Sequence, residues 1–199
     1  VGDIKYVDRN GDGVISYEQD RGYVGAAAYP KFVGGLSFSG DWKGIDLSFL
    51  FQAGLGRDVA LTGVYSGGIM DNTQMTKPFY HGGNSPKYLV ENSWREDNTN
   101  AEFPRLSIVQ ASSNNAYSST FWYRSGDYLR LKNLQIGYTF PQKWMSRIGI
   151  DRLRIYFEGQ NLWTVSELTK FNIDPEQPGV SNGYYPQQRI FSFGVNLAF

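Results

Sequence analysis

In the final eleven residues of the chain, RIFSFGVNLAF, apolar side chains alternate with small or polar ones from Phe191 to the end. The apolar residues are Phe191, Phe193, Val195, Leu197 and Phe199. Because successive side chains of a β-strand point to opposite faces, the segment is predicted to be a strand with one apolar and one polar face. Such a strand suits a position between lipid and a water-filled lumen, although strands of soluble sandwiches alternate in the same way.

Four other segments show the same alternation. Together with the last one, they predict strands at about residues 31–42, 44–57, 127–140, 152–165 and 189–199. Each exceeds the usual soluble strand of about 5 to 6 residues and is long enough to cross a bilayer at a tilt. We therefore predict an all-β fold, an antiparallel transmembrane β-barrel segment.

The connections between these segments are of two kinds. Residues 58–126 and 166–188 form long polar loops, whereas DWKG and PQKWMSRIGID are short turns. Outer-membrane barrels have short periplasmic turns and long extracellular loops. This predicts an extracellular loop over residues 1–30 and a barrel portion over residues 31–199. Since about eight strands are the fewest that commonly close a membrane barrel, the rest must come from a longer polypeptide or from other chains.

Composition excludes several other classes of protein. The 19 basic and 19 acidic residues create no large field, so nucleic acid is not an expected partner. The chain has no cysteine for disulfides or thiolate metal sites. It contains 14 Tyr, 13 Phe, 5 Trp and 23 Gly but no apolar run of about 18 residues, which is typical of barrels and not of transmembrane helices.

The segment DRNGDGVI spaces carboxylate and amide side chains at alternate positions and then supplies glycine for a tight turn. This is the first half of a calcium loop. A regular loop would end with an acid at Gln19, so its neighbour Asp20 is the displaced closing candidate. The candidate ligands are Asp8, Asn10, Asp12, the carbonyl of Val14, and Asp20. We expect a structural Ca²⁺, and the alternative is an Asx-rich turn that binds no ion.

Candidates for catalysis are few. His81 is the one histidine, and a loop histidine among glycines is more often a surface or packing residue. Asp46, Arg154 and Glu158 are predicted to face the lumen, where polar side chains are expected without any chemistry. We therefore predict no enzymatic activity. Aromatic side chains of the loops could instead stack on sugars or peptides, or contact a partner or other loops: Tyr65, Phe79, Tyr80, Trp94, Tyr117, Trp122, Tyr184 and Tyr185.

Several segments of the chain have specific patterns. The most specific are YLRLKNLQIGY at residues 128–138, GQNL at residues 159–162 and the terminal strand, accompanied by KYVDRNGDGVIS and DPE. Taken in order, they resemble the C-terminal end of a SusC/RagA-type TonB-dependent outer-membrane transporter. The resemblance covers nearly the whole chain. It implies a 22-stranded barrel closed around an N-terminal plug, of which this chain supplies the last five strands.

The resemblance also implies a function and partners. Such transporters sit in the cell outer membrane as multi-pass proteins with extracellular loops, surrounded by lipid. They import glycans or peptides together with a SusD-like surface lipoprotein, using energy from a TonB complex that acts through the missing N-terminal part. The apolar residues of the terminal strand, ending at Phe199, match the family's signal for the barrel assembly machinery. The acidic loop at Asp8, Asn10, Asp12 and Gly13 also matches the family.

Two other functions remain open from the sequence. The first is a soluble calcium-binding β-sandwich, such as a carbohydrate-binding module, which would fold alone. The second is a barrel hydrolase, which would need His81. The transported substrate and the residues that contact it are not identified by the sequence, because specificity in the family lies largely in the plug, the lipoprotein and loops outside this chain.

Overall fold

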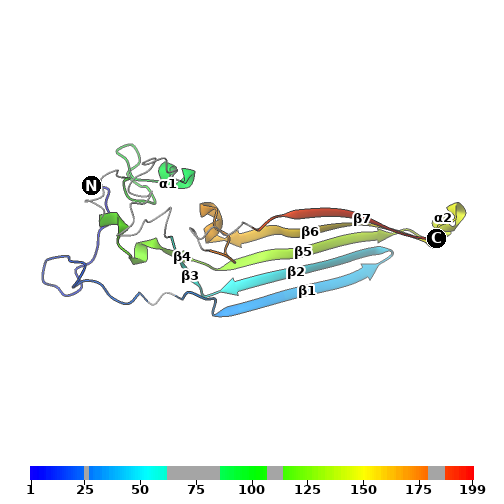
Figure 1. Cartoon of the computed structure of the whole chain (residues 1–199), viewed down its shortest axis with the longest axis horizontal. Coiled ribbons are helices and arrows are strands. Elements are labelled where there is room, and N and C mark those ends of the chain that lie inside the picture. Colours follow the sequence, from blue (N-terminus) through cyan, green and yellow to red (C-terminus); the bar gives the residue numbers. More distant parts are fainter. Residues whose placement is uncertain (25–26, 62–85, 107–113, 179–186) are drawn as a thin grey trace. The chain divides into compact units, whose positions relative to one another are not determined.

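The computed structural model describes residues 1–24, 27–61, 86–106, 114–178 and 187–199 (Figure 1). The chain divides into two compact units. The loop unit comprises Val1–Ala28, Asp58–Arg124 and Pro178–Tyr184. The sheet unit comprises Tyr29–Arg57, Ser125–Gln177 and Tyr185–Phe199.

The sheet unit is built on five long antiparallel strands in the order β1-β2-β5-β6-β7. The strands are β1 (Phe32–Trp42), β2 (Ile45–Leu55), β5 (Tyr128–Thr139), β6 (Arg152–Ser166) and β7 (Ile190–Ala198). They occupy the five segments whose alternation predicts strands, and Figure 1 shows them side by side. Most of the regular structure is therefore β-strand. No helix among the described residues is long and apolar enough to span a membrane.

The pairing register collects the apolar side chains on one face of this sheet. One row across all five strands is Trp42, Ile45, Tyr138, Ile155 and Val195. A neighbouring row is Gly40, Leu47, Ile136, Phe157 and Phe193. Many of these side chains are solvent-exposed, and Phe193 reaches 83%. The face is thus a continuous apolar surface that the sheet unit itself leaves largely uncovered.

The GQNL segment marks a break in this regular pairing. Leu131 pairs with Trp163, but Asn133 pairs with Gln160, so the strands advance by different numbers of residues. Asn161 takes a left-handed φ of 51° and donates a hydrogen bond to the Gln188 carbonyl at 3.1 Å. Such a bulge re-aims the side chains that follow it. Here it leaves Trp163 on the apolar face.

Two short connections join strands of the sheet, one between β1 and β2 and one between β5 and β6. The β1–β2 turn places Lys43 at φ 50° and Gly44 at φ 87°, the left-handed pair that a two-residue hairpin turn requires. A side chain at Gly44 would also collide with the Thr139 carbonyl. Between β5 and β6 lie α2 (Gln142–Met145) and the 3₁₀ turn η5 (Ser146–Ile148).

A short 3₁₀ helix and a small apolar core follow β6 in the sheet unit. The 3₁₀ helix η6 (Glu167–Phe171) begins at Ser166, whose hydroxyl accepts a hydrogen bond from the Leu168 amide. Leu168, Phe171 and Ile173 are buried. This small core holds the chain directly after β6.

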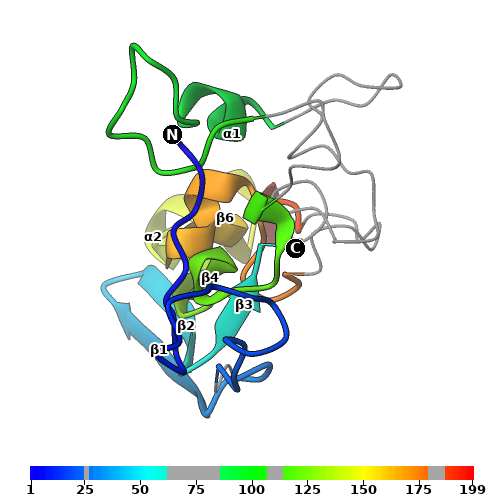
Figure 2. The same cartoon turned by 90° about the vertical axis from the view of Figure 1, so that its left-hand side faces the viewer.

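The loop unit has its own small core. It contains a two-stranded sheet of β3 (Asp58–Ala60) and β4 (Tyr123–Ser125), together with α1 (Lys87–Glu91), η3 (Asn114–Ala116) and η4 (Thr120–Trp122). Figure 2 shows α1 and the β3–β4 pair. The buried apolar residues are Val59, Leu61, Leu89, Phe103 and Trp122. Phe103 and Trp122 stack with their ring centroids 6.1 Å apart.

The close approach of Gly194 to Tyr156 on the neighbouring strand predicts that a larger side chain at Gly194 destabilises the sheet. A Cβ atom at Gly194 of β7 would overlap the ring of Tyr156 on β6, over which Arg154 lies at 4.7 Å. In the full-length protein, Gly194→Val should therefore lower the free energy of unfolding by about 1–3 kcal/mol through overpacking. The folded fraction, measured from heat-modifiable gel mobility, should fall.

The matched control is Gly35→Ala on the same polar face, where a Cβ atom would meet ordinary contact distances. Adding Tyr156→Ala to Gly194→Val should restore much of the folded fraction. Normal folding of Gly194→Val with Tyr156 present would show that this contact does not set the packing of β7.

Candidate functional site

The predicted calcium loop is closely folded by its own side chains. Asp8 accepts hydrogen bonds from the Gly11 and Gly13 amides at 2.7 and 2.8 Å. Asn10 accepts one from the Asp12 amide at 3.0 Å. Asp12 in turn accepts one from the Val14 amide at 2.8 Å. The oxygen-bearing side chains thus fold the backbone into successive tight turns.

Asp20 closes this segment from the other end. Its carboxylate accepts hydrogen bonds from the Arg9 and Ser16 amides, both at 2.7 Å. These backbone donors, that of Ser16 foremost, hold the pKa of the Asp20 carboxyl below its usual range. The Asp20 carboxylate therefore contacts the backbone at Arg9, near the start of the loop.

The side chains of this segment suit a hard cation, because the ligand atoms that Asp8, Asn10, Asp12 and Asp20 can offer to a metal are oxygens. Across the part of the chain that the structure describes, however, no three acidic or imidazole side chains gather as a metal site. The loop therefore retains both interpretations raised by the sequence, a calcium site and an Asx-rich turn.

The N-terminal residues are clamped across the loop unit. Arg105 binds the Asp3 carboxylate through two hydrogen bonds of 2.8 and 3.0 Å. Asn115 donates to Asp3 at 2.8 Å and accepts from the Ile4 amide at 2.8 Å. Tyr6 donates its hydroxyl proton to the Asn114 carbonyl at 2.7 Å. This clamp has no local signal in the sequence, because its partners lie more than a hundred residues apart.

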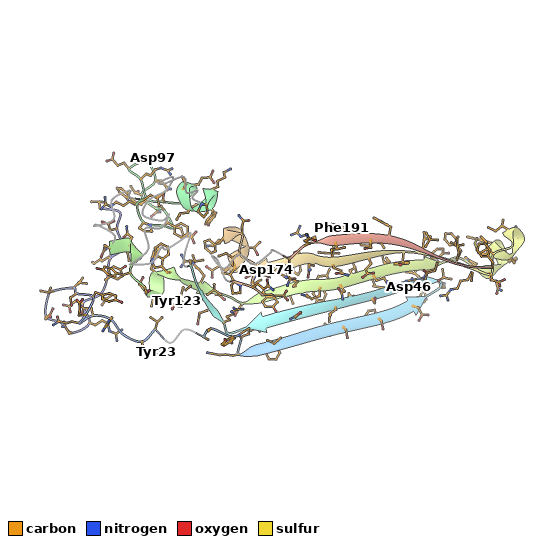
Figure 3. All side chains as sticks on the ribbon, viewed as in Figure 1. Tyr23, Asp46, Asp97, Tyr123, Asp174 and Phe191 are labelled. Atoms are coloured by element: carbon orange, nitrogen blue, oxygen red, sulfur yellow. The ribbon has the colours of Figure 1, made fainter. Side chains whose placement is uncertain are left out.

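The polar face of the sheet carries the other candidate residues. Asp46, labelled in Figure 3, pairs with Arg154 through hydrogen bonds of 2.9 and 2.5 Å. Glu158 lies in a row of small and amide side chains with Ser39, Ser48, Gln135 and Ser192. Parts of this row line a shallow groove. Because Asp46 and Arg154 neutralise each other, neither is poised as a free acid or base.

The apolar residues of the terminal strand lie on the opposite face. Phe191, Phe193, Val195 and Leu197 lie in β7, and Phe199 follows it. All five are more than half exposed. Phe157 contacts Phe191 and Phe193, with ring centroids 6.3 and 5.2 Å apart. Phe191 is labelled in Figure 3.

The loop aromatic residues have varied positions. Trp122 is 2% exposed and donates its indole N–H to the Asn115 carbonyl, so its ring belongs to the core and is not a stacking platform. Trp94 packs over Gly2. Tyr117 stacks on Tyr17, with centroids 5.0 Å apart. His81, Tyr65, Phe79, Tyr80, Tyr184 and Tyr185 lie outside the described residues.

The known proteins similar to this chain include TonB-dependent receptors. The TonB-dependent receptor P26 of Formosa agariphila is 28% identical over 215 residues, which cover 100% of this chain and 20% of that protein. The TonB-dependent receptor SusC of Bacteroides thetaiotaomicron is 26% identical over 197 residues, which cover 98% of this chain and 17% of that protein. The chain thus spans about a fifth of the length of these relatives. No family model matches it.

Solved structures agree. A structure of the RagAB peptide importer in its open-open state superposes with a TM-score of 0.63 at 25% identity, covering 98% of this chain and 20% of that one. Another, of the RagAB peptide transporter, gives 0.58 at 27% identity, covering 87% and 18%.

The class of proteins that this chain resembles in both sequence and fold is therefore that of TonB-dependent receptors and transporters. Within it, the predicted resemblance to the SusC/RagA type is confirmed, and the chain corresponds to a fragment of such a transporter. These relatives are receptors and transporters, which points to a role other than catalysis. The alternative of a soluble calcium-binding sandwich gains no support.

The clamp at Asp3 generates a pH prediction. Its hydrogen bonds with Arg105, more than any other influence, lower the pKa of the Asp3 carboxyl below the ordinary value of 3.8. The clamp should therefore be fully stabilising above pH 3.8 and weaken as the pH falls through the lowered pKa. Because both side chains are partly exposed, we expect a two- to fivefold loss, roughly, of hydrogen-exchange protection at the Ile4 and Arg105 amides.

The measurement uses the full-length protein and compares each amide with an unstructured peptide at the same pH. Asp3→Asn should show reduced protection at pH 7 and little further loss in acid. Equal pH dependence in the wild type and in Asp3→Asn would rule out Asp3 as the titrating group.

Proposed function

We propose that this chain is one part of the wall of an outer-membrane importer for glycans or peptides. The observation that carries the proposal is the five-stranded sheet, apolar on one face and polar on the other, in a chain similar to SusC and RagAB. In lipid, only helices and closed barrels satisfy every backbone polar group. The sheet suits a section of such a barrel.

The two faces have different solvents in this proposal. The exposed row that includes Ile136 and Phe193 contacts hydrocarbon, where apolar surface is stable. The row of Ser48, Gln135 and Glu158 faces the lumen and offers hydrogen bonds to a polar cargo or to a plug. A hydroxyl-rich glycan and the backbone of a peptide both match that chemistry.

The edge strands support a larger barrel. Within the described sheet, β1 and β7 each pair on one side only, whereas β2, β5 and β6 pair on both. An unpaired edge in lipid is costly. We therefore assign the neighbours of β1 and β7 to further strands of a longer polypeptide, in keeping with a 22-stranded barrel.

The partners follow from the same assignment. A SusD-like surface lipoprotein would cover the extracellular mouth, and a TonB complex would act through a plug outside this chain. The barrel assembly machinery would recognise the alternate apolar residues from Phe191 to Phe199. The similarity to SusC and to the two-component RagAB importer supports the lipoprotein partner.

A pair of adjacent residues tests the membrane assignment. Phe193 is already 83% exposed, so a charge there would be tolerated if water covered this face. In a bilayer, Phe193→Lys should destabilise the barrel by about 2–4 kcal/mol near the midplane. We expect the full-length protein with Phe193→Lys to show a large loss of folded, outer-membrane barrel and of uptake of labelled probes.

The probes are a fluorescent tryptic digest of casein and fluorescent maltooligosaccharides, compared with a deletion strain. The matched control is Ser192→Lys, whose side chain faces Glu158 on the polar face and should be tolerated. Recovery of the wild-type protein in the soluble fraction, or equal tolerance of both substitutions, would contradict the proposal.

We also propose that the loop of Asp8, Asn10, Asp12, Val14 and Asp20 binds a structural Ca²⁺. Three carboxylates and one amide supply hard oxygen ligands in a single short segment, and the carbonyl of Val14 would complete the set. Its glycines, Gly11 and Gly13, adopt positive φ values of 76° and 79°, which lets the loop turn tightly.

Calcium addition and removal test this second proposal. Binding to the folded state alone stabilises by about 2.7 kcal/mol at a free concentration 100 times the dissociation constant. In the full-length protein, Ca²⁺ should therefore raise the hydrogen-exchange protection of the Gly11 and Gly13 amides, and a chelator should reverse it. Asp8→Asn/Asp12→Asn should abolish the effect, whereas Asp97→Asn should not. No response to millimolar Ca²⁺ would leave the loop an Asx-rich turn.

A further inference from the structure

Arg130 lies almost fully buried on the polar face of the sheet. It belongs to β5, where its register partners are Gln52 of β2 and Thr164 of β6, and it is 3% exposed. Arginine is rarely buried unless it is paired. The groups that pair with the Arg130 guanidinium therefore indicate its role in the structure.

Every polar group of the Arg130 guanidinium has a partner. Its Nε donates to the Thr164 hydroxyl at 2.9 Å, and one terminal nitrogen donates to both carboxylate oxygens of Asp174 at 3.0 Å. The other terminal nitrogen donates to Glu176 at 2.7 Å and to Gln187 at 2.8 Å. One side chain on the sheet thus binds two carboxylates of the segment after β6.

Two further groups hold the same segment. Lys132 of β5 donates to both carboxylate oxygens of Glu176 at 3.0 and 3.1 Å. Arg57, directly after β2, donates to the Pro175 carbonyl at 3.3 Å. The charges of Arg130 and Lys132 balance those of Asp174 and Glu176. Asp174 is labelled in Figure 3.

Residues 167–177, which we call the shelf, have one buried and one exposed side. The buried side chains are Leu168, Phe171, Ile173 and Pro175, and the exposed ones include Thr169, Lys170, Asn172 and Gln177. Backbone hydrogen bonds from Ile173 to Leu168 and from Gln177 to Asp174 fix the shape of the shelf. Its exposed surface is polar and carries hydrogen-bonding groups.

We propose that the shelf is a fixed polar surface along the cargo path and that Arg130 is its positioning residue. The proposal rests on the proposed function, because only then does the polar face of the sheet line a channel. If the shelf moved away as a lid, the buried charge of Arg130 and the partly buried charges of Lys132, Asp174 and Glu176 would lose their partners, which is unfavourable. Cargo would therefore pass over the shelf, and gating would belong to other segments.

Hydrogen exchange of the full-length protein tests whether the shelf is fixed. In the wild type, the Ile173, Glu176 and Gln177 amides should exchange as slowly as amides of the paired strands β5 and β6. Arg130→Met should speed their exchange by about a hundredfold, because it leaves the partly buried Asp174 without its cationic partner and Glu176 with Lys132 alone. Amides near the Leu134–Gly159 pair of β5 and β6 should stay protected.

Two results would overturn the assignment. Fast exchange of the shelf amides in the wild type would make the shelf mobile. Unchanged exchange in a folded Arg130→Met variant, or an equal rise throughout β5 and β6, would show that Arg130 does not position the shelf. If Arg130→Met does not fold, Glu176→Gln decides, with an expected rise of about tenfold, and Arg130→Gln/Asp174→Asn should restore protection because it removes one charge of each sign and keeps the Lys132–Glu176 pair.

Cysteine labelling in intact cells tests the exposed side of the shelf. Thr169→Cys should react with a membrane-impermeant maleimide, whereas Leu168→Cys, at a position that is 0% exposed, should not. Labelling of neither or of both would contradict the proposed surface. Failure of the proposed function is distinguishable, since the wild-type protein would then be absent from the outer-membrane fraction whatever the labelling shows.

Discussion

Backbone hydrogen bonding between neighbouring antiparallel strands is the constraint on which this structure depends. Register determines which side chains lie across from one another, and a slip of one residue would exchange the two faces. With the observed register, the exposed row through Ile136 and Phe193 is wholly apolar or glycine, while the row through Ser48 and Glu158 is polar. The division of the sheet into an apolar face and a polar face is therefore a consequence of pairing.

The charged side chains of the sheet that form ion pairs lie on its polar side. The ion pair of Asp46 and Arg154 and the Arg130 network both lie on the polar side of the sheet, where partners are close enough to neutralise each charge. In the loop unit, Asp3 and Arg105 play a similar part by tying the N-terminal residues to a distant loop. The Arg130 network and the Asp3–Arg105 pair thus each hold an irregular segment that lacks strand pairing of its own.

The strands were predictable because alternation with a period of two is a local property, visible in segments such as RIFSFGVNLAF. The Asx-rich character of the loop from Asp8 to Asp20 was equally local, and its oxygen ligands were named from spacing alone. For Trp122 the sequence left both a stacking platform and a contact with other loops open, because nothing in the neighbouring residues indicates that Phe103 stacks on it. Arg130 carries one sequence signal, a cation at a polar-face position of its strand, and its register partners Gln52 and Thr164 supply no acid to balance it.

The sequence by itself determined which segments become strands, which of their faces is apolar, and the resemblance to SusC/RagA-type transporters, because periodicity and short motifs are encoded by adjacent residues. Only the tertiary structure decided that Arg130 meets Asp174 and Glu176, that Asp3 meets Arg105, and that GQNL forms a bulge. Those contacts join residues tens to a hundred positions apart or depend on the register of a partner strand. Their geometry exists only once the sheet and the loop core have assembled.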